Sequence, residues 1–305
     1  MNRTLVLLTL VLGCSAPEAT EAPEATEAPD ASEASAASAA SAAAGASAAS
    51  EAPAASAKSD TSDTSASDAT PDDHAARVVA AADRDPADTA LDAGRHPAEL
   101  LRFFGVQPGM RVGEMMSGGG YSVELLARAV GPEGAVYGVN SPFILERFAA
   151  APWAARLEKP VNGKVVRLDR EFDAPFPDDV RDLDQVWSIL VYHDFFWMET
   201  DRAAMNANIF AALKPGGVYA VVDHSAALGS GDRDVKTLHR GDEATIRHEI
   251  EAAGFELVEE ASFLRNPDDD RAWNASPSAA GEQRGQSDRF VLKFRKPLPP
   301  EEPTE

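Results

Sequence analysis

From about Ala75 onward, apolar residues follow two alternating spacings along the chain. Short runs that are apolar almost throughout predict strands, and apolar residues three or four positions apart predict helices. The predicted strands are residues 110–116, 134–140, 164–169, 184–194 and 218–224. Helical patterns at 122–130, 143–157 and 201–214 separate most of them. Such alternation implies right-handed crossovers and an α/β domain with a parallel sheet.

The end of the chain breaks this alternation. A helix at 242–254 is followed by two strands, at 255–264 and 289–296, with no helix between them. The last strand is therefore predicted to run antiparallel to its neighbours. Within the predicted helix 143–157, Pro152 is expected to break or kink the helix, because proline lacks the N–H that the helix needs.

The first residues have a different character. Residues 1–13 contain one basic residue and an apolar run. That run is too short for a membrane span of about 20 residues, and it predicts a cleavable export signal. The "VLGC" that ends at Cys14 resembles the lipobox of bacterial lipoproteins, which implies a lipidated Cys14 and an exported protein anchored to a membrane of the bacterial cell envelope. The alternative is an ordinary secretory signal with a chance cysteine.

Residues 14–74 are predicted to be a disordered acidic spacer, because their Ala, Ser, Glu and Pro residues cannot form a packed core. The folded domain is assigned to residues 75–298, and residues 299–305 are predicted to be a disordered tail. Twelve acidic and two basic residues up to His74 account for nearly half of the net charge of −22. The remaining domain is also acidic, which argues against nucleic acid as a partner.

A glycine-rich segment, "EMMSGGGYS" from Glu114 to Ser122, joins the first predicted strand to a helix. Glycines at such a junction let the backbone approach a ligand, and the helix N-terminus favours negative charge. A phosphate-binding P-loop would need "GK[ST]", which is absent. A dinucleotide fingerprint would need a third glycine where Val123 stands, which disfavours a nucleotide-dependent oxidoreductase.

The acid followed by glycines resembles the first motif of class I S-adenosylmethionine-dependent methyltransferases. "DLDQVWSILVYHD", "ALKPGGVYAVVDH" and "IEAAGFELVEE" are similar to later segments of that family. More narrowly, "RHPAELLRFFGVQPGM" and "HRGDEATIRHEIEAAGF" resemble a group of predicted bacterial methyltransferases with export signals. The resemblance implies a Rossmann-like, doubly wound sheet of seven strands, mostly parallel with an antiparallel last strand.

The resemblance also implies roles for single residues. Gly118, Gly119 and Gly120 would pass the methionine part of S-adenosylmethionine, and Glu114 would orient this loop or bind the cofactor's amino group. Asn140 occupies the strand-end position where the family has an acid that binds the ribose hydroxyls. Asp169, at the end of the next strand, occupies a position that often binds the adenine amino group; the alternative is an ordinary exposed carboxylate.

The chemistry of the site is less clearly indicated. His193 is the best candidate for a general base, with Asp194 able to fix its tautomer, and a purely structural His193 is the alternative. A direct contact between these neighbours requires that the strand has ended before them. The six histidines have no zinc-like spacing, so no metal is predicted.

Two classes of function are consistent with these features. The first is a methyltransferase that acts on a small molecule or an envelope component, with S-adenosylmethionine as cofactor. The second is a methyltransferase-fold lipoprotein that binds a ligand without catalysis. Export favours the second, because the cofactor is made in the cytoplasm, whereas Glu114 and the glycines favour the first.

Overall fold

The structure is a computed structural model, and it describes residues 71–300. The predicted export signal, Cys14, nearly all of the predicted spacer and the last five residues of the predicted tail lie outside the described residues. Helix α1 (Pro71–Val79) begins just before the domain boundary expected at residue 75. In the described part of the chain, no helix is both long and apolar enough to cross a membrane.

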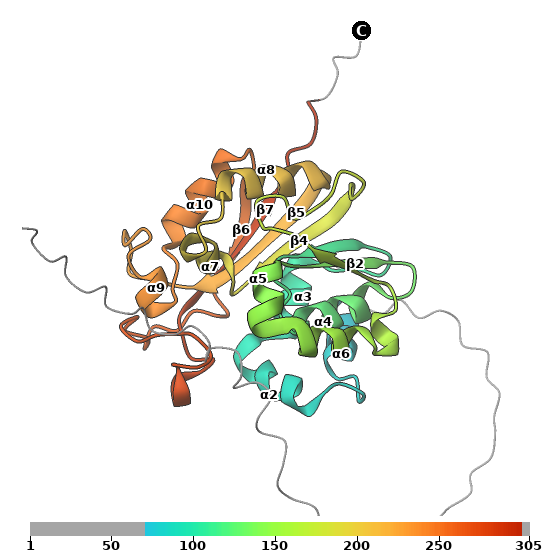
Figure 1. The fold of residues 1–305 in the computed structure, drawn as a ribbon, viewed down its shortest axis with the longest axis horizontal. Coiled ribbons are helices and arrows are strands. Elements are labelled where there is room, and N and C mark those ends of the chain that lie inside the picture. Colours follow the sequence, from blue (N-terminus) through green and yellow to red (C-terminus); the bar gives the residue numbers. More distant parts are fainter. Residues whose placement is uncertain (1–70, 301–305) are drawn as a thin grey trace, which may run out of the picture. The chain divides into compact units, whose positions relative to one another are not determined.

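Seven strands form one sheet in the order β3-β2-β1-β4-β5-β7-β6 (Figure 1). They are β1 (Arg111–Glu114), β2 (Ala135–Asn140), β3 (Val165–Asp169), β4 (Leu183–Ile189), β5 (Leu213–His224), β6 (Glu256–Ala261) and β7 (Arg289–Arg295). Strands β1 to β5 pair in parallel, and β7 pairs antiparallel with both β5 and β6. The predicted fold class, including the antiparallel last strand, is therefore confirmed.

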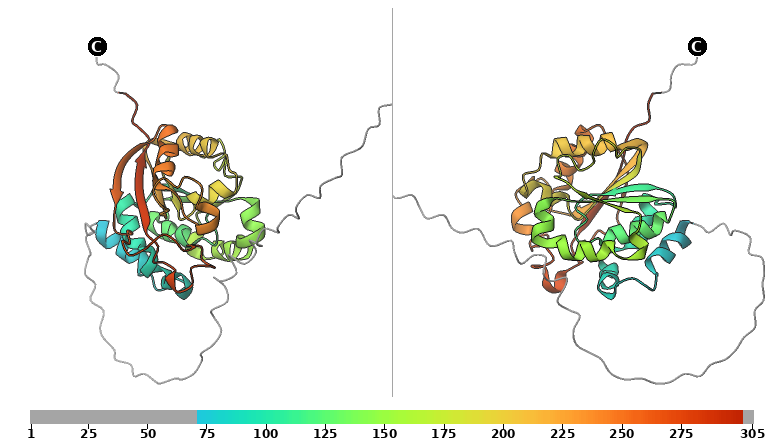
Figure 2. Two further views of the ribbon diagram at one scale, coloured as in Figure 1. Left: turned by 90° about the vertical axis from the view of Figure 1, so that its left-hand side faces the viewer. Right: turned by 45° about the vertical axis from the view of Figure 1, so that its right-hand side comes forward.

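Helices lie on both sides of this twisted sheet (Figure 2). Besides α1, the longer ones are α2 (Pro86–Arg95), α3 (Pro97–Phe104), α4 (Tyr121–Val130), α6 (Ala150–Leu157), α8 (Arg202–Ala212) and α10 (Glu243–Ala252). The shorter ones are α5 (Pro142–Ile144), the π-helical turn η3 (Leu145–Ala149), the 3₁₀ turns η4 (Pro160–Asn162) and η5 (Gly281–Gln283), α7 (Tyr192–Trp197) and α9 (Val235–Leu238).

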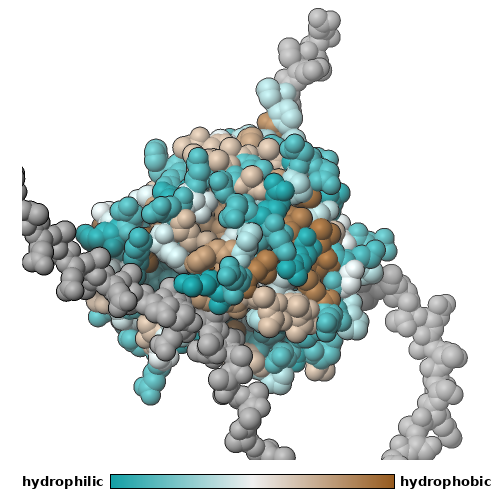
Figure 3. Space-filling model, in the orientation of Figure 1, coloured by the Kyte–Doolittle hydropathy of each residue, from teal (hydrophilic) through white to brown (hydrophobic). Residues whose placement is uncertain are grey.

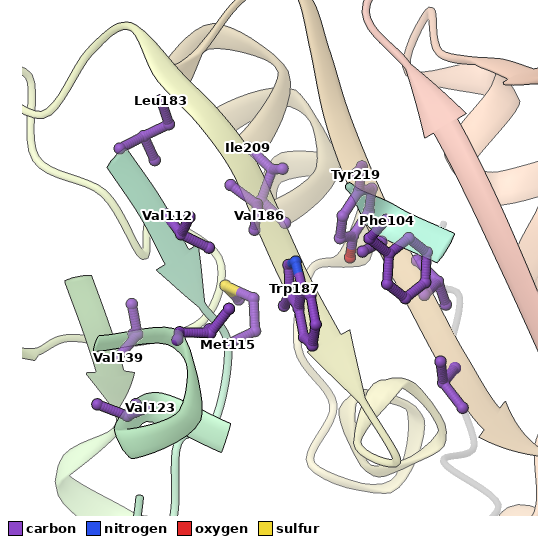
Figure 4. Packing of buried hydrophobic residues seen from close by; sticks show 14 of the residues in the cluster. Phe104, Val112, Met115, Val123, Val139, Leu183, Val186, Trp187, Ile209 and Tyr219 are labelled. Carbon is purple, nitrogen blue, oxygen red and sulfur yellow. The ribbon is translucent and has the colours of Figure 1, made fainter. Parts of the chain in front are cut away.

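Strand β4 shows how the two faces of the sheet are filled, because successive side chains on a strand point to opposite faces. Trp187 meets Phe104 of α3 edge to face, with ring centroids 5.2 Å apart. The preceding residue, Val186, lies on the other face of the sheet, where it is paired with Tyr219 of β5. Tyr219 packs against Phe255, which follows α10, at 5.4 Å between ring centroids. Figure 4 shows Phe104, Trp187, Val186 and Tyr219 among these buried side chains. The face seen in Figure 3 mixes hydrophilic residues with apolar ones.

Two elements depart from the sequence prediction in ways that shape the site. The strand predicted at 184–194 ends at Ile189, because Leu190 takes a left-handed conformation with φ 61°, and Tyr192–Trp197 forms α7. The predicted helix 143–157 is interrupted by η3 before α6 begins at Ala150. Pro152 follows closely after this π-helical turn, so the regular α-helical pattern is interrupted in the turn before the proline, whose ring and missing N–H disfavour it there.

Candidate functional site

Parallel strands place Glu114, Asn140, Ile189 and His224, the last residues of β1, β2, β4 and β5, at one edge of the sheet. The glycine loop that leaves β1 at this edge contains three left-handed residues: Met116 (φ 48°), Gly118 (φ 53°) and Gly120 (φ 82°). A Cβ atom at Gly118 would have no neighbour within 4 Å. Gly118 is therefore the point of the loop where a ligand can approach the backbone.

The other side of the loop is closely packed by α6. A Cβ atom at Gly120 would lie 2.8 Å from the indole ring of Trp153, and one at Gly138 in β2 would lie 2.7 Å from it. Arg156 Nε donates to Gly119 O over 3.0 Å. Gly119 and Gly120 are therefore in contact with side chains of α6. The resemblance had implied that they contact the cofactor.

Glu114 ends β1 beside this loop. Its side chain is buried, and its Oε2 atom has no hydrogen-bond partner. Burial raises the pKa of Glu114 to about 7, although the hydroxyl groups of Ser122 and Ser117 act in the opposite direction. An unpartnered buried carboxylate oxygen is costly in an isolated domain, so it indicates a position prepared for a donor, such as an ammonium group.

Asn140 ends β2 as predicted, but its amide is already used. The N–H of Gly118 donates to Asn140 Oδ1 over 2.8 Å, and Asn140 Nδ2 donates to Gly118 O over 3.2 Å. The side chain is fully buried. Asn140 thereby holds the glycine loop in place, and its burial keeps the second lone pair of Oδ1 and the second N–H of Nδ2 away from solvent.

Asp169 lies at the end of β3 and is 42% exposed. Its carboxylate accepts two hydrogen bonds from Arg167, at 2.7 Å and 2.8 Å. This pair on one strand matches the ordinary exposed carboxylate that the sequence left open as the alternative. Of the residues predicted to hold the cofactor, Glu114 and Gly118 have free bonding capacity or space, whereas Asn140 and Asp169 are engaged within the chain.

His193 and Asp194 lie on α7, just beyond the point where β4 ends. The His193 ring is fully buried, and its Nδ1–H donates to Asp223 Oδ1 over 2.6 Å. The backbone N–H of His193 donates to the other oxygen of Asp223 over 2.8 Å. Asp223, at the end of β5, therefore fixes the imidazole, and the role expected for Asp194 is corrected.

Asp194 lies on the other side of the same ring. Its Oδ1 is 3.3 Å from His193 Nε2 and accepts a hydrogen bond from Trp197 Nε1 at 2.7 Å. The contact has the distance of an ion pair but not the geometry of a hydrogen bond, and Nε2 has no other partner among the described residues. Burial acts to lower the pKa of His193, but the charges of Asp194 and Asp223 outweigh it and raise that pKa to about 10.

Two more histidines surround His193. The His239 ring centroid is 4.1 Å from that of His193, and the His224 centroid is 5.8 Å away. His224 Nδ1 is hydrogen-bonded to Ser287 Oγ at 2.6 Å. Burial and the charge of His193 lower the pKa of His239 to about 4. Sequence patterns missed Asp223 and His239 as neighbours of His193, because they come from β5 and from the segment after α9.

A well-formed groove lies elsewhere. A groove of about 700 Å³ is formed at the amino-terminal ends of β2 and β3, and Val136, Pro160 and Lys164 are among the residues that line it. It is on the opposite edge of the sheet from Glu114 and His193. Among the described residues, Arg128 Nε is buried without a partner in this groove, but the guanidinium is otherwise paired with Glu124 and Asp83. We therefore place the functional site by its chemistry, at the sheet edge where a carboxylate and an imidazole have unpartnered buried atoms.

No protein-family model and no curated protein matches this chain. Several solved structures match it. A methyltransferase dependent on S-adenosylmethionine from Aquifex aeolicus matches with a TM-score of 0.50 and 18% identity, over 70% of this chain and 94% of its own. One from Mesorhizobium loti matches with a TM-score of 0.45 and 18% identity, over 67% and 99%.

Aeropyrum pernix fibrillarin, which contains natively bound S-adenosyl-L-methionine, matches with a TM-score of 0.42 and 14% identity, over 64% of this chain and 73% of its own. At these identities the likeness concerns the fold. Together with the strand order and the antiparallel β7, the similarity to the Aquifex aeolicus structure shows that this chain has the class I methyltransferase fold.

Proposed function

We propose that this protein binds S-adenosylmethionine and transfers its methyl group to a small molecule or to a component of the cell envelope. The observation that carries the proposal is the unpartnered, buried Oε2 of Glu114, at the end of the strand from which the loop with Gly118 departs. A carboxylate at that place can accept a hydrogen bond from the amino group of the cofactor's methionine part. The backbone at Gly118 leaves the space that a close approach requires.

Methyl transfer needs few catalytic groups besides those that bind the reactants. The bond from the sulfonium to the methyl group breaks as a bond to the acceptor forms, and the positive charge on sulfur disappears. The enzyme therefore acts mainly by holding the two reactants in line. A base is needed only if the acceptor must lose a proton. His193 and Asp194 lie at the same sheet edge as Glu114, and the partly exposed Asp194 and His239 connect the His193 ring with solvent.

A second candidate function is binding of a ligand without catalysis. It is favoured by Asn140, whose amide is bonded to Gly118 at both ends, and by Asp169, which pairs with Arg167. The amide of Asn140 is fully buried and Arg167 occupies one position on each oxygen of Asp169, so neither side chain is as open to a ribose or an adenine as an unpaired carboxylate would be. On this alternative, Glu114 would bind another cationic group, and S-adenosylmethionine would have no measurable affinity.

Calorimetric titration of the full chain with S-adenosylmethionine separates these functions. We expect binding to the wild-type protein and a loss of roughly 10–100-fold in affinity, about 1.4–2.7 kcal/mol, for Gly118→Val. Valine resists the left-handed conformation at Gly118 and would fill the space beside it. Gly105→Val is the matched control, because Gly105 is also left-handed and open but caps α3. Heat absent from the wild-type titration would exclude the methyltransferase.

We further propose that the protein is exported and anchored to the bacterial cell envelope through Cys14. The support is the "VLGC" sequence and the position of the chain's single cysteine. Replacement of Cys14 by serine is expected to move the protein from the membrane fraction to the soluble fraction, or to leave its signal uncleaved. Wild-type protein that is fully soluble after cell lysis would contradict the anchor.

A further inference from the structure

Three potential metal ligands converge beside the candidate site: His193 and Asp194 on α7, and His239 after α9. We call them the His193 cluster. Their ligating atoms all lie within 4.8 Å of one another. His239 Nδ1 is 3.6 Å from Asp194 Oδ1, and His193 Nε2 is 3.3 Å from the same oxygen. The cluster is distinct from Glu114 and the glycine loop.

Two of these separations are close to those of ligands that share one ion, and the third, between His193 and His239, is within 4.8 Å. With bonds of about 2.0–2.1 Å and a tetrahedral angle, two ligand atoms on Zn²⁺ lie about 3.3 Å apart. The His193–Asp194 separation has this value, and the His239–Asp194 separation is slightly longer. The first is not a hydrogen bond, since His193 Nε2 has no partner although the ring is fully buried. Once Nε2 loses its proton, His193 and Asp194 can each donate a lone pair to an ion held between them.

The surroundings orient His193 as a ligand. Its Nδ1–H donates to the buried carboxylate of Asp223 at 2.6 Å, which leaves Nε2 directed at Asp194 and His239. A carboxylate on the far nitrogen is the usual outer partner of a metal-bound histidine, because it sets the tautomer and increases the basicity of the ligating nitrogen. Asp223 is itself held by the backbone N–H groups of His193 and His224, each at 2.8 Å.

The segment that carries His239 is also fixed. The next residue, Arg240, is fully buried and donates to Asp269 and to Ser225 O. Gly241 pairs with Ser225 in an isolated bridge, and a Cβ atom on Gly241 would lie 3.5 Å from His193. His239 is thus held against His193 before any ion binds, as preorganised ligands require.

We propose that His193, Asp194 and His239 form a binding site for a divalent transition-metal ion, with Zn²⁺ as the best match. Two imidazole nitrogens and one carboxylate suit Zn²⁺, whereas Mg²⁺ and Ca²⁺ prefer oxygen ligands only. Three protein ligands leave a coordination position for water or substrate. The side chains of Asp194 and His239 are 12% and 22% exposed, so solvent and an ion can reach the cluster.

This inference goes beyond the proposed methyl transfer and does not rest on it. It also changes the role of His193, because an ion bound to Nε2 takes the position that a general base would need. A proton is the competing occupant: without metal, the ring lies between Asp223 at Nδ1 and Asp194 at Nε2, and Nε2 holds H⁺. The absence of zinc-like spacing in the sequence does not bear on this cluster, whose members meet only in the folded chain.

The test measures Zn²⁺ uptake by the full chain, first stripped of metal, in competition with a chromophoric chelator and without S-adenosylmethionine. We expect one Zn²⁺ ion per chain, and visible absorption bands when Co²⁺ replaces it. Asp223→Asn should weaken binding roughly 10–100-fold, as loss of an outer partner does. His239→Ala and Asp194→Asn each remove a ligand and should weaken it more. In Asp194→Asn, the amide oxygen can still accept the hydrogen bond from Trp197 Nε1, so the variant changes the ligand without removing this contact.

Two control variants should leave the affinity unchanged: His248→Ala, which removes an exposed histidine of α10, and Cys14→Ser, which removes the only thiol. Circular dichroism establishes that each variant is folded. A folded wild-type chain that takes up no Zn²⁺ would overturn the inference and show that the cluster holds a proton. The inference would also be overturned if both His239→Ala and Asp194→Asn bound Zn²⁺ as tightly as the wild-type chain. Because the cofactor is absent from the assay, neither result depends on the proposed methyltransferase activity.

Discussion

Replacing Trp153 by alanine is expected to lower the free energy of unfolding by about 3–5 kcal/mol, the usual cost of truncating a fully buried tryptophan. Its side chain is 0% exposed and fills the space between the glycine loop and β2. The indole Nε1 has no hydrogen-bond partner, so the loss is one of packing. Urea unfolding followed by circular dichroism measures the change.

The same substitution should weaken binding at Gly118. Alanine would leave a cavity against Gly120 and Gly138, and the loop would lose the surface that defines its conformation. Phe143→Ala is the matched control, because Phe143 is an aromatic residue of the same helical stretch but is 37% exposed. We expect that control to cost about 1 kcal/mol or less. A change below about 1 kcal/mol for Trp153→Ala would show that α6 does not hold the loop.

The sheet was predictable from the sequence because each parallel strand is a short apolar run between helical patterns. The two last strands, with no helix between them, likewise required an antiparallel β7. The end of β4 was not predictable. The apolar run continues to Tyr192, and only the left-handed conformation of Leu190 ends the strand. A bulky residue rarely adopts that conformation, so the sequence around Leu190 does not predict the end of the strand.

The candidate site was predicted only in part, for a related reason. Glu114 and Asn140 were correctly located at the ends of β1 and β2, because strand ends can be read from the apolar pattern. Their partners could not be read in this way. Asn140 bonds to Gly118 in the loop after a different strand, and His193 meets Asp223 and His239 from distant segments. Such contacts depend on how crossovers bring loops together, which spacing along one segment does not encode.

The contribution of Glu114 to the stability of the fold is expected to fall by about 3 kcal/mol as pH rises through neutrality. Burial raises the pKa of Glu114 from 4.5 to about 7, and each tenfold weakening of an acid corresponds to about 1.4 kcal/mol. Below pH 4.5 the carboxyl is protonated in both the folded and unfolded chains and contributes nothing. Between the two pKa values the unfolded chain ionises first and is favoured, and above pH 7 the full penalty applies.

Glu114→Gln is therefore expected to stabilise the fold by up to about 3 kcal/mol at about pH 8 and to change little at about pH 4. It should also weaken binding of S-adenosylmethionine, because glutamine offers the cofactor's ammonium group no charge. For the wild-type chain, affinity should rise with pH up to about 7, since binding needs the ionised carboxylate. Urea unfolding and calorimetric titration at both pH values measure these effects, with the exposed Glu133→Gln as control. A variant that gains stability at the higher pH but binds the cofactor as well as wild type would show that Glu114 is merely buried and that the cofactor's amino group lies elsewhere.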